Sequence, residues 1–153
     1  MKYICLTQND LEYVSQCDCL LADFFKSEAN YDSNYLIQDK LKSLLNDLED
    51  NNNILLAAID ETRVVGFLFA YINKSKTDIL PVAHIAFVYV DTQHRKKGIA
   101  TQLITTLFKQ LEKRNIDIVE VKAFNDNIAA TNLYEKFGFD VLWVNYRRKI
   151  SNN

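Results

Sequence analysis

The sequence predicts an α/β domain in which a mixed β-sheet carries helices on its faces. Short apolar runs rich in β-branched and aromatic residues alternate with stretches whose apolar residues recur every three or four positions, in the order β-α-α-β-β-β-α-β-α-β. The chain has 153 residues, of which 48% are hydrophobic, so one domain can bury a sizeable core. We therefore expect residues 1–153 to form a single domain.

The first part of the chain predicts a strand followed by two helices. Residues 2–7 form the expected strand, and Asn9-Asp10 gives a cap signal for the helix after it. The apolar face of that helix consists of Leu11, Val14, Leu21, Phe24 and Phe25. A second helix is expected over residues 33–50, where the same spacing joins Ile37, Leu41, Leu44, Leu45 and Leu48.

Three β-rich runs follow these helices. Residues 54–59 and 64–72 are separated by four polar residues, which predicts two strands of a hairpin. Gly66, inside the second run, indicates a bulge or a close approach of two backbones. Residues 79–90 predict a further strand, and Pro81 lies near its start because the middle of a central strand excludes proline.

The clearest helix of the chain follows Asp91. Its apolar stripe consists of Ile99, Leu103, Ile104, Leu107, Phe108 and Leu111. A strand over residues 116–123 comes next. Strand 79–90, this helix and strand 116–123 should therefore form a right-handed parallel crossover.

The end of the chain predicts a shorter helix and a last strand. The helix is expected over residues 128–137, and Gly138 suits the left-handed position that often follows a helix. Residues 141–149 are again rich in β-branched and aromatic side chains. We expect them to form the last strand of the sheet.

Net charge and metal-ligand spacing exclude several partners. Eighteen basic and twenty acidic residues give a net charge of −2, which lacks the positive field that nucleic-acid binding needs. The three cysteines are an odd number, and the C-x-C of Cys17 and Cys19 is one ligand pair short of a structural zinc site. His84 and His94 lie too far apart for the H-E-x-x-H zinc pair. We expect no nucleic-acid partner, no metal, and reduced thiols in the cytoplasm.

Glycine-rich nucleotide loops and membrane spans are excluded as well. The three glycines of the chain, Gly66, Gly98 and Gly138, lie too far apart for a Rossmann fingerprint or a Walker loop. The longest apolar runs, residues 64–72 and 79–90, are shorter than the span of about 18 residues that crosses a membrane. Any phosphate must therefore be bound with a single glycine, and no membrane association is expected.

The turn after strand 79–90 is basic. Residues 94–97 read His-Arg-Lys-Lys and precede the long helix, whose first turn offers unpaired amides and about half a positive charge. Gly98 and Ala100 lack bulk, so a phosphate could approach the backbone closely. A solvated basic turn is the alternative, and this segment alone favours neither.

Two segments of the second half resemble the GCN5-related N-acetyltransferase (GNAT) superfamily. Residues 95–100 read R-x-x-G-x-A and match its Q/R-x-x-G-x-G/A acetyl-CoA motif. Residues 127–139 match its downstream pattern, N-x-x-A-x-x-x-Y-E-K-x-G-F. The motifs cover the last half of the chain, while the first half agrees in its order of elements. The resemblance implies the GNAT fold, a mostly antiparallel central sheet with a parallel β-α-β unit at the cofactor site.

The resemblance also implies acetyl-CoA as cosubstrate and no metal. In the family, pantetheine pairs with the strand before the first motif as an added strand, and the diphosphate rests on the amides of the motif turn. Carried over residue by residue, the cofactor would be bound by Val88, Val90, Arg95, Lys96, Lys97, Gly98, Ile99, Ala100, Thr101, Asn127 and Tyr134.

Catalytic roles follow from the same resemblance. Tyr134 would lie near the thioester sulfur and act as the general acid that protonates the departing thiolate, with a packed core aromatic as the alternative. The attacking amine must lose a proton, and the candidate bases are His84, before the motif, or Glu120, on the strand after the long helix. A backbone N–H near Val90 would stabilise the oxyanion.

The sequence thus predicts an acetyl-CoA-dependent N-acetyltransferase acting on a primary amine of a small molecule, peptide or protein, by direct transfer in a ternary complex. No cysteine lies in either motif, so a covalent acetyl-cysteine route has no support. The alternative is a non-catalytic acyl-CoA-binding or regulatory module with the GNAT fold. A homodimer is left open.

Residues 90–104 are similar in particular to the corresponding part of aminoglycoside 3-N-acetyltransferases. Those enzymes carry an aspartate on the preceding strand where this sequence has Phe87. That departure argues against aminoglycoside activity. The acceptor is therefore not predicted from the cofactor turn.

Overall fold

The computed structural model describes residues 1–27, 44–73, 80–146, 148 and 150. The chain divides into two compact units, Met1–Lys122 and Ala123–Asn153. A single domain over residues 1–153 therefore stays a prediction.

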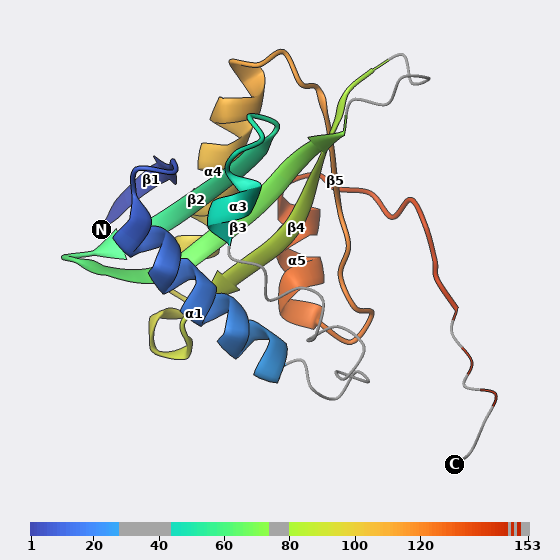
Figure 1. Ribbon diagram of the computed structural model, residues 1–153. Helices are drawn as coiled ribbons and strands as arrows, with labels where there is room; N and C mark the ends of the chain where they lie inside the picture. The colour runs from blue at the N-terminus through green and yellow to red at the C-terminus, as the bar shows by residue number, and fades with distance from the viewer. Residues whose placement is uncertain (28–43, 74–79, 147, 149, 151–153) are drawn as a thin grey trace. The chain divides into compact units, whose positions relative to one another are not determined.

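The first unit is built on a five-stranded sheet, drawn from blue-violet to orange in Figure 1. Its strands lie in chain order, and the first four pair antiparallel while the last pairs parallel with its neighbour. They are β1 (Lys2–Leu6), β2 (Asn53–Asp60), β3 (Arg63–Asn73), β4 (Val82–Val90) and β5 (Ile118–Val121). The mixed sheet, the hairpin and the parallel pair are as the sequence predicts.

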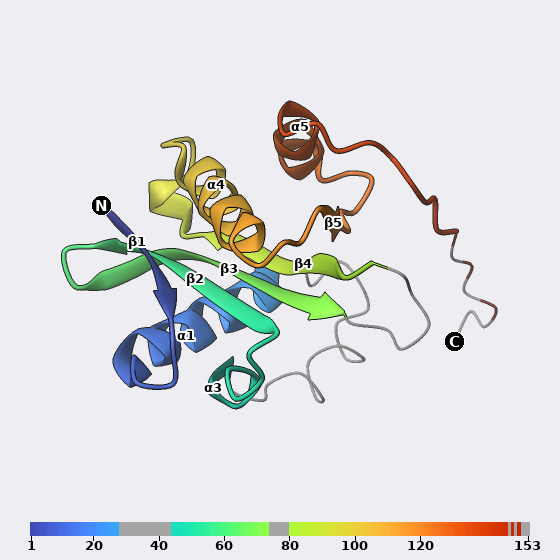
Figure 2. The ribbon, with the colours of Figure 1, turned by 90° about the horizontal axis from the view of Figure 1, so that it is seen from above.

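Helices cover both faces of this sheet. Figure 2 shows α1 and α3 on one face and α4 on the other. Their bounds are α1 (Leu11–Ser27), α3 (Leu44–Asp47), the 3-10 turn η1 (Thr92–His94) and α4 (Ile99–Glu112). Most of the helix expected over residues 33–50 lies outside the described residues, and its end corresponds to α3.

The predicted start of α1 after Asn9-Asp10 is confirmed, although the Asp10 side chain bonds back to Thr7 and not to a helix amide. The Asp10 carboxylate accepts hydrogen bonds from the amide and the hydroxyl of Thr7, both at 2.8 Å. The amide of Val14 donates to the Asp10 carbonyl at 3.0 Å, which is the first bond of the helix. The short strand β1 therefore passes directly into α1.

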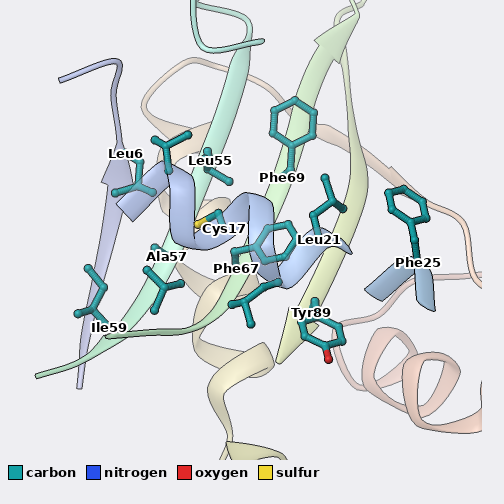
Figure 3. Packing of buried hydrophobic residues seen from close by; sticks show 13 residues of the cluster. Leu6, Cys17, Leu21, Phe25, Leu55, Ala57, Ile59, Phe67, Phe69 and Tyr89 are labelled. Carbon is teal, nitrogen blue, oxygen red and sulfur yellow. The ribbon is translucent and has the colours of Figure 1, made fainter. Parts of the chain in front are cut away.

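Between α1 and the sheet lies an apolar cluster, shown from close by in Figure 3. Leu55, Phe67 and Phe69 contribute to it from β2 and β3, and Cys17 and Leu21 contribute from α1. Burial raises the pKa of Cys17 to about 12, so this thiol stays protonated. Side chains alternate between the faces of a strand, which fixes these residues toward α1.

The opposite face of the sheet packs against α4. Leu56 and Leu68 alternate with the residues that face α1, and both are fully buried. The apolar stripe of α4 that the sequence predicts is buried as well: Ile99, Leu103, Ile104, Leu107 and Leu111. Each such side chain stabilises the fold by about 1.5–3 kcal/mol relative to exposure. α4 is thereby fixed to the sheet, and its first turn lies at the end of β4.

One predicted strand is wrong. Residues 139–146 form no strand in the structure, and Val141 and Tyr146 are 85% and 91% exposed. The segment has the composition of a strand, but a strand exists only where a neighbour completes its hydrogen-bond ladder. The other β segments differ only in length, since β4 begins just after Pro81 and β5 is limited to four residues.

Candidate functional site

The outer edge of β4 is only half covered. β5 pairs with β4 from Val82 to Ile85 and no further, whereas β3 pairs along the whole strand to Val90. The pairing with β3 shifts between Phe69↔Phe87 and Ala70↔Ile85, so that Ala86 is an extra, bulged residue. From this bulge onward, no described strand covers the outer edge of β4.

The backbone groups of Val88 and Val90 point to this open edge. The amide of Asp91 donates to the carbonyl of Val65 on β3 at 2.9 Å, so Asp91 faces β3. Successive residues of an extended strand direct their amides and carbonyls to opposite edges. Val88 and Val90, the two residues predicted to pair with pantetheine, therefore present backbone groups where no strand of the described chain accepts them.

A second bulge, in β3, brings the start of α4 close to the sheet. Ala58 pairs with Gly66 and Ile59 with Val64, which leaves Val65 extra. A Cβ on Gly66 would lie 3.0 Å from the Tyr89 carbonyl oxygen and 3.3 Å from Cγ2 of Ile99, the first residue of α4. Both readings of Gly66 from the sequence, a bulge and a close approach, are confirmed.

The turn between β4 and α4 is organised around Asp91. Its carboxylate, 15% exposed, lies 3.2 Å from a guanidinium nitrogen of Arg63 and 3.3 Å from Nδ1 of His94. Burial by itself raises the pKa of Asp91, but the Gln93 amide, the His94 ring and the Arg63 guanidinium outweigh it and hold the pKa below its ordinary value. The ionised Asp91 carboxylate thus links the turn to Arg63 on β3.

The backbone of the turn ends in two left-handed residues. Lys96 has φ +60° and Gly98, the N-cap of α4, has φ +77°. The first bond of α4 runs from the Gln102 amide to the Gly98 carbonyl at 3.0 Å, so the amides of residues 99–101 precede the helical ladder. Exposed lysines at 96 and 97 stand beside these amides. The arrangement suits an anion.

Arg95 folds back onto the end of β4. Its Nε donates to the Val90 carbonyl at 3.0 Å, and its guanidinium carbon lies 5.5 Å from the centre of the Tyr89 ring. The motif arginine thus fixes the turn against the strand and uses one of the two edge carbonyls. Among the described residues, the other N–H groups of its guanidinium make no hydrogen bond.

The two candidate bases, His84 and Glu120, lie together. They are paired in register across the parallel strands, and His84 Nδ1 is 3.5 Å from Glu120 Oε2. The ring of Tyr71 on β3 stacks on the His84 ring, with centres 5.0 Å apart and planes at 25°. Tyr71 alternates with Phe67 and Phe69 along β3 and therefore lies on the α1 face of the sheet, as do its register partners His84 and Glu120. We call Tyr71, His84 and Glu120 the His84 cluster.

Phe87 lies between the His84 cluster and the turn. Its ring packs edge-on against Phe24 and Phe25 at 5.7 and 5.6 Å and stacks on Phe69 at 6.5 Å. The position where aminoglycoside 3-N-acetyltransferases carry an aspartate is therefore part of the apolar core here.

The second unit contains α5 (Ile128–Lys136) with both of its ends capped. Asn127 is the N-cap, and its side-chain oxygen accepts from the Ala130 amide at 3.1 Å. At the other end, the amides of Phe139 and Gly138 donate to the carbonyls of Tyr134 and Glu135, with Gly138 at φ +78°. This is a Schellman motif, so the prediction for Gly138 is confirmed.

Tyr134 belongs to that C-terminal cap. Its ring lies 5.7 Å from the ring of Phe139, the apolar contact that accompanies a Schellman motif. Burial raises the pKa of Tyr134 to about 12. The phenol therefore keeps its proton at neutral pH, as a general acid must.

A family model described as "Acetyltransferase (GNAT) family" matches residues 16–139. The match covers the bulged strand, the basic turn and both motifs. The chain belongs to the GNAT family. The fold that the resemblance implies is confirmed with it.

Individual relatives agree with this membership. A mycothiol acetyltransferase of Kytococcus sedentarius is 32% identical over 88 residues, which are 56% of this chain and 28% of that protein. The chain thus spans less than a third of the length of this relative. An aminoglycoside acetyltransferase from an uncultured soil metagenomic sample, solved with trehalose, has a TM-score of 0.78 and 25% identity, covering 98% of this chain and 96% of the other.

A solved structure of AAC(6')-Iy in complex with the bisubstrate analog CoA-S-monomethyl-acetylneamine shares the fold of this GNAT chain. It has a TM-score of 0.75 and 15% identity, covering 97% of each chain. Among the described residues no helix is long and apolar enough to cross a membrane, and no three His, Cys, Asp or Glu side chains gather as metal ligands would.

Several residues of the site gave no signal in the sequence. Asp91 and Arg63 come from the ends of two different strands. The Val65 carbonyl, which accepts a hydrogen bond from the Asp91 amide, belongs to the bulged residue of β3. Tyr71 reads as an ordinary strand residue. Contacts of this kind depend on strand register, which local spacing does not carry.

Proposed function

We propose that this GNAT chain transfers an acetyl group from acetyl-CoA to a primary amine, by direct attack in a ternary complex. One observation carries the proposal: the uncovered edge of β4 leads directly into the amides at the start of α4 that precede its first helical hydrogen bond. An extended, amide-bearing arm and a diphosphate match these two features in that order. Family membership supports acyl transfer as the reaction class.

The residues of the first unit fit the cofactor. Pantetheine amides would pair with the backbone of Val88 and Val90 at the open edge. The diphosphate would rest on the turn at residues 95–101. The amides of Ile99, Ala100 and Thr101 would donate to it, and the left-handed Gly98 would let it approach the backbone. The side chains of Arg95, Lys96 and Lys97 would supply positive charge. Asn127 and Tyr134 complete the set that we assign to the cofactor.

The chemical step needs one proton removed and one supplied. The acceptor ammonium gives up a proton to a base, His84 or Glu120, and its nitrogen attacks the thioester carbonyl. A backbone N–H on the open edge of β4 would stabilise the oxyanion. The C–S bond then breaks, and the thiolate takes a proton from Tyr134.

The acceptor is a primary amine of a small molecule, a peptide or a protein. Aminoglycosides and mycothiol appear in the names of the similar proteins. Phe87 in place of a carboxylate argues against the aminoglycoside 3-N reaction. The three cysteines are free, which supports the cytoplasm as the place of action.

Calorimetric titration with acetyl-CoA, followed by a thiol-release assay, tests the proposal. The amines are kanamycin, spermidine, free amino acids and a peptide with an N-terminal alanine. Binding together with steady thiol release for one amine supports the enzyme. Binding without release for any of them favours the alternative, a non-catalytic acyl-CoA-binding module, and no binding contradicts both.

Replacing Tyr134 by Phe tests the general acid. A thiolate leaves fairly well unaided, so we expect kcat to fall by about tenfold, less than the 10²–10⁴ that a full acid–base contribution can reach. Because the pKa of Tyr134 is about 12, the pH profile of the wild type should have no alkaline limb from this phenol below pH 10. An unchanged kcat in the variant, with the acetyl-CoA affinity retained, would remove Tyr134 from the mechanism.

A further inference from the structure

The His84 cluster is the group of titratable side chains on the sheet that the cofactor site does not use. His84 and Glu120 are 25% and 39% exposed at their side chains, so both reach solvent. Tyr71 is 41% exposed and covers one face of the imidazole. Tyr71, His84 and Glu120 are register partners on three adjacent strands, so they form one cluster and are not isolated surface residues.

The direction of the open edge relates this cluster to the reaction. A diphosphate at residues 95–101 lies at the carboxyl end of β4, so an arm paired with Val90 and Val88 runs back toward Ala86. At Ile85 the pairing with β5 begins and closes the edge. The thioester must therefore stop near the bulge, one residue pair from His84↔Glu120. This step rests on the proposed function.

The ring nitrogens of His84 have different surroundings. Nδ1 lies 3.5 Å from the Glu120 carboxylate, close enough for an ion pair when the ring is protonated. In the described residues no hydrogen bond engages Nε2. In a neutral imidazole, the group that binds one ring nitrogen decides which nitrogen carries the proton and which one can accept a proton.

We propose that His84 and Glu120 act as one unit, in which Glu120 holds Nδ1–H of His84 and leaves Nε2 to take a proton from the acceptor ammonium. His84 is then the catalytic residue, and Glu120 is a positioning residue that acts through it. Tyr71 keeps the plane of the ring by stacking. Of the two candidate bases, His84 is then the base and Glu120 orients its ring.

The step is balanced as follows. The N–H bond of the ammonium breaks, its proton passes to Nε2, and the freed electron pair forms the C–N bond at the thioester carbonyl. The C–S bond breaks and the thiolate is protonated by Tyr134. When the tetrahedral adduct collapses, the nitrogen releases its second proton to solvent, and the Tyr134 phenolate takes up one proton from solvent. The imidazolium returns its own proton to solvent, so the net products are the amide, the free thiol and one proton.

Nitrogen-15 NMR of the imidazole rings tests the unit without any acceptor. The chain contains two histidines, and His84→Gln assigns the signals by removing one of them. At alkaline pH we expect the wild type to show Nδ1–H and an unprotonated Nε2 for His84, and we expect Glu120→Gln to lose this preference. Protonation of Nε2 in the wild type would overturn the proposal, whatever the activity.

Kinetics test the proton transfer, with the fastest amine of the kanamycin, spermidine, amino acid and peptide panel. His84→Gln should lower kcat about 100-fold and leave the dissociation constant of acetyl-CoA unchanged. Glu120→Gln should lower kcat/KM about tenfold, because the ring is then no longer held in the tautomer that leaves Nε2 free. Asp117→Asn, just before β5, is the matched control and should change neither.

The outcomes separate this inference from the proposed function. Among the described residues, the titratable groups in contact with His84 are Glu120 on β5 and Tyr71 on β3. Thiol release at an unchanged rate in His84→Gln, with normal thermal unfolding, overturns the inference and leaves the acetyltransferase intact. No thiol release by the wild type overturns the proposed function and the proton transfer, while the tautomer still decides whether Glu120 holds the ring.

Discussion

The two ends of the functional stretch of β4 are built differently. At the carboxyl end, the turn offers mainly backbone amides, and its side chains are used to hold it: Asp91 binds Arg63 and His94, and Arg95 binds the Val90 carbonyl. At the bulge end, the His84 cluster offers side chains with one ion-pair contact and one stacking contact. On our proposal, binding of the cofactor would thus depend on backbone geometry, and the chemistry would depend on side-chain atoms.

This difference predicts which measurement each substitution changes. Variants of the turn should alter acetyl-CoA affinity or stability and leave the His84 tautomer as it is. Variants of the His84 cluster should alter turnover and leave affinity as it is. A turn variant that acts on turnover alone would break the distinction.

Gly98→Glu should have the largest effect on binding. A Cβ at Gly98 would meet nothing within 4 Å, so the side chain fits, but the φ of +77° strains any other residue by about 1–2 kcal/mol. Glu adds a negative charge beside the phosphates, and we expect acetyl-CoA to bind about 100-fold more weakly by calorimetry. Gly98→Ala is the matched control for strain and should weaken binding only a few-fold. Equal losses in both variants would contradict a phosphate site here.

Gly66→Val should have the next largest effect. Its Cβ would meet the Tyr89 carbonyl at 3.0 Å and the side chains of Ile99 and Val90 at 3.3 Å. Overpacking of this kind costs about 1–3 kcal/mol, so the free energy of unfolding in urea should fall by that amount. Displacement of Ile99 should also weaken acetyl-CoA binding, and Gly66→Ala should show both effects to a smaller degree. Unaltered affinity in Gly66→Val would mean that this close approach does not position α4.

Asp91→Asn should have the smallest effect, and a pH-dependent one. The pKa of Asp91 is lower in the folded chain than its ordinary value of about 3.9, so its stabilisation is complete above that value and is lost as pH falls through the folded pKa. We expect the wild type to be about 1 kcal/mol more stable than the variant at pH 7, and the difference to shrink below pH 4. Urea unfolding at both pH values measures it. A difference that grows in acid would reverse the assigned role of Asp91.

The sequence anticipated the elements that local signals encode. The stripe of α4, the start of α1 after Asp10 and the left-handed Gly138 are properties of a few neighbouring residues, and the structure confirms each of them. The last strand, at residues 141–149, was predicted from composition alone. It failed because propensity does not supply the neighbouring strand that a ladder requires.

The sequence by itself indicated the family, and it supplied the proposed cofactor turn and both candidate bases, because their signals lie in short motifs and in residue types. Only the tertiary structure decided that His84 and Glu120 form a pair, that Val65 receives the Asp91 amide, and that β5 leaves the second half of β4 open. These facts depend on the register and the bulges of strands distant in the chain. Register is set by packing of the whole sheet, so no local pattern encodes it.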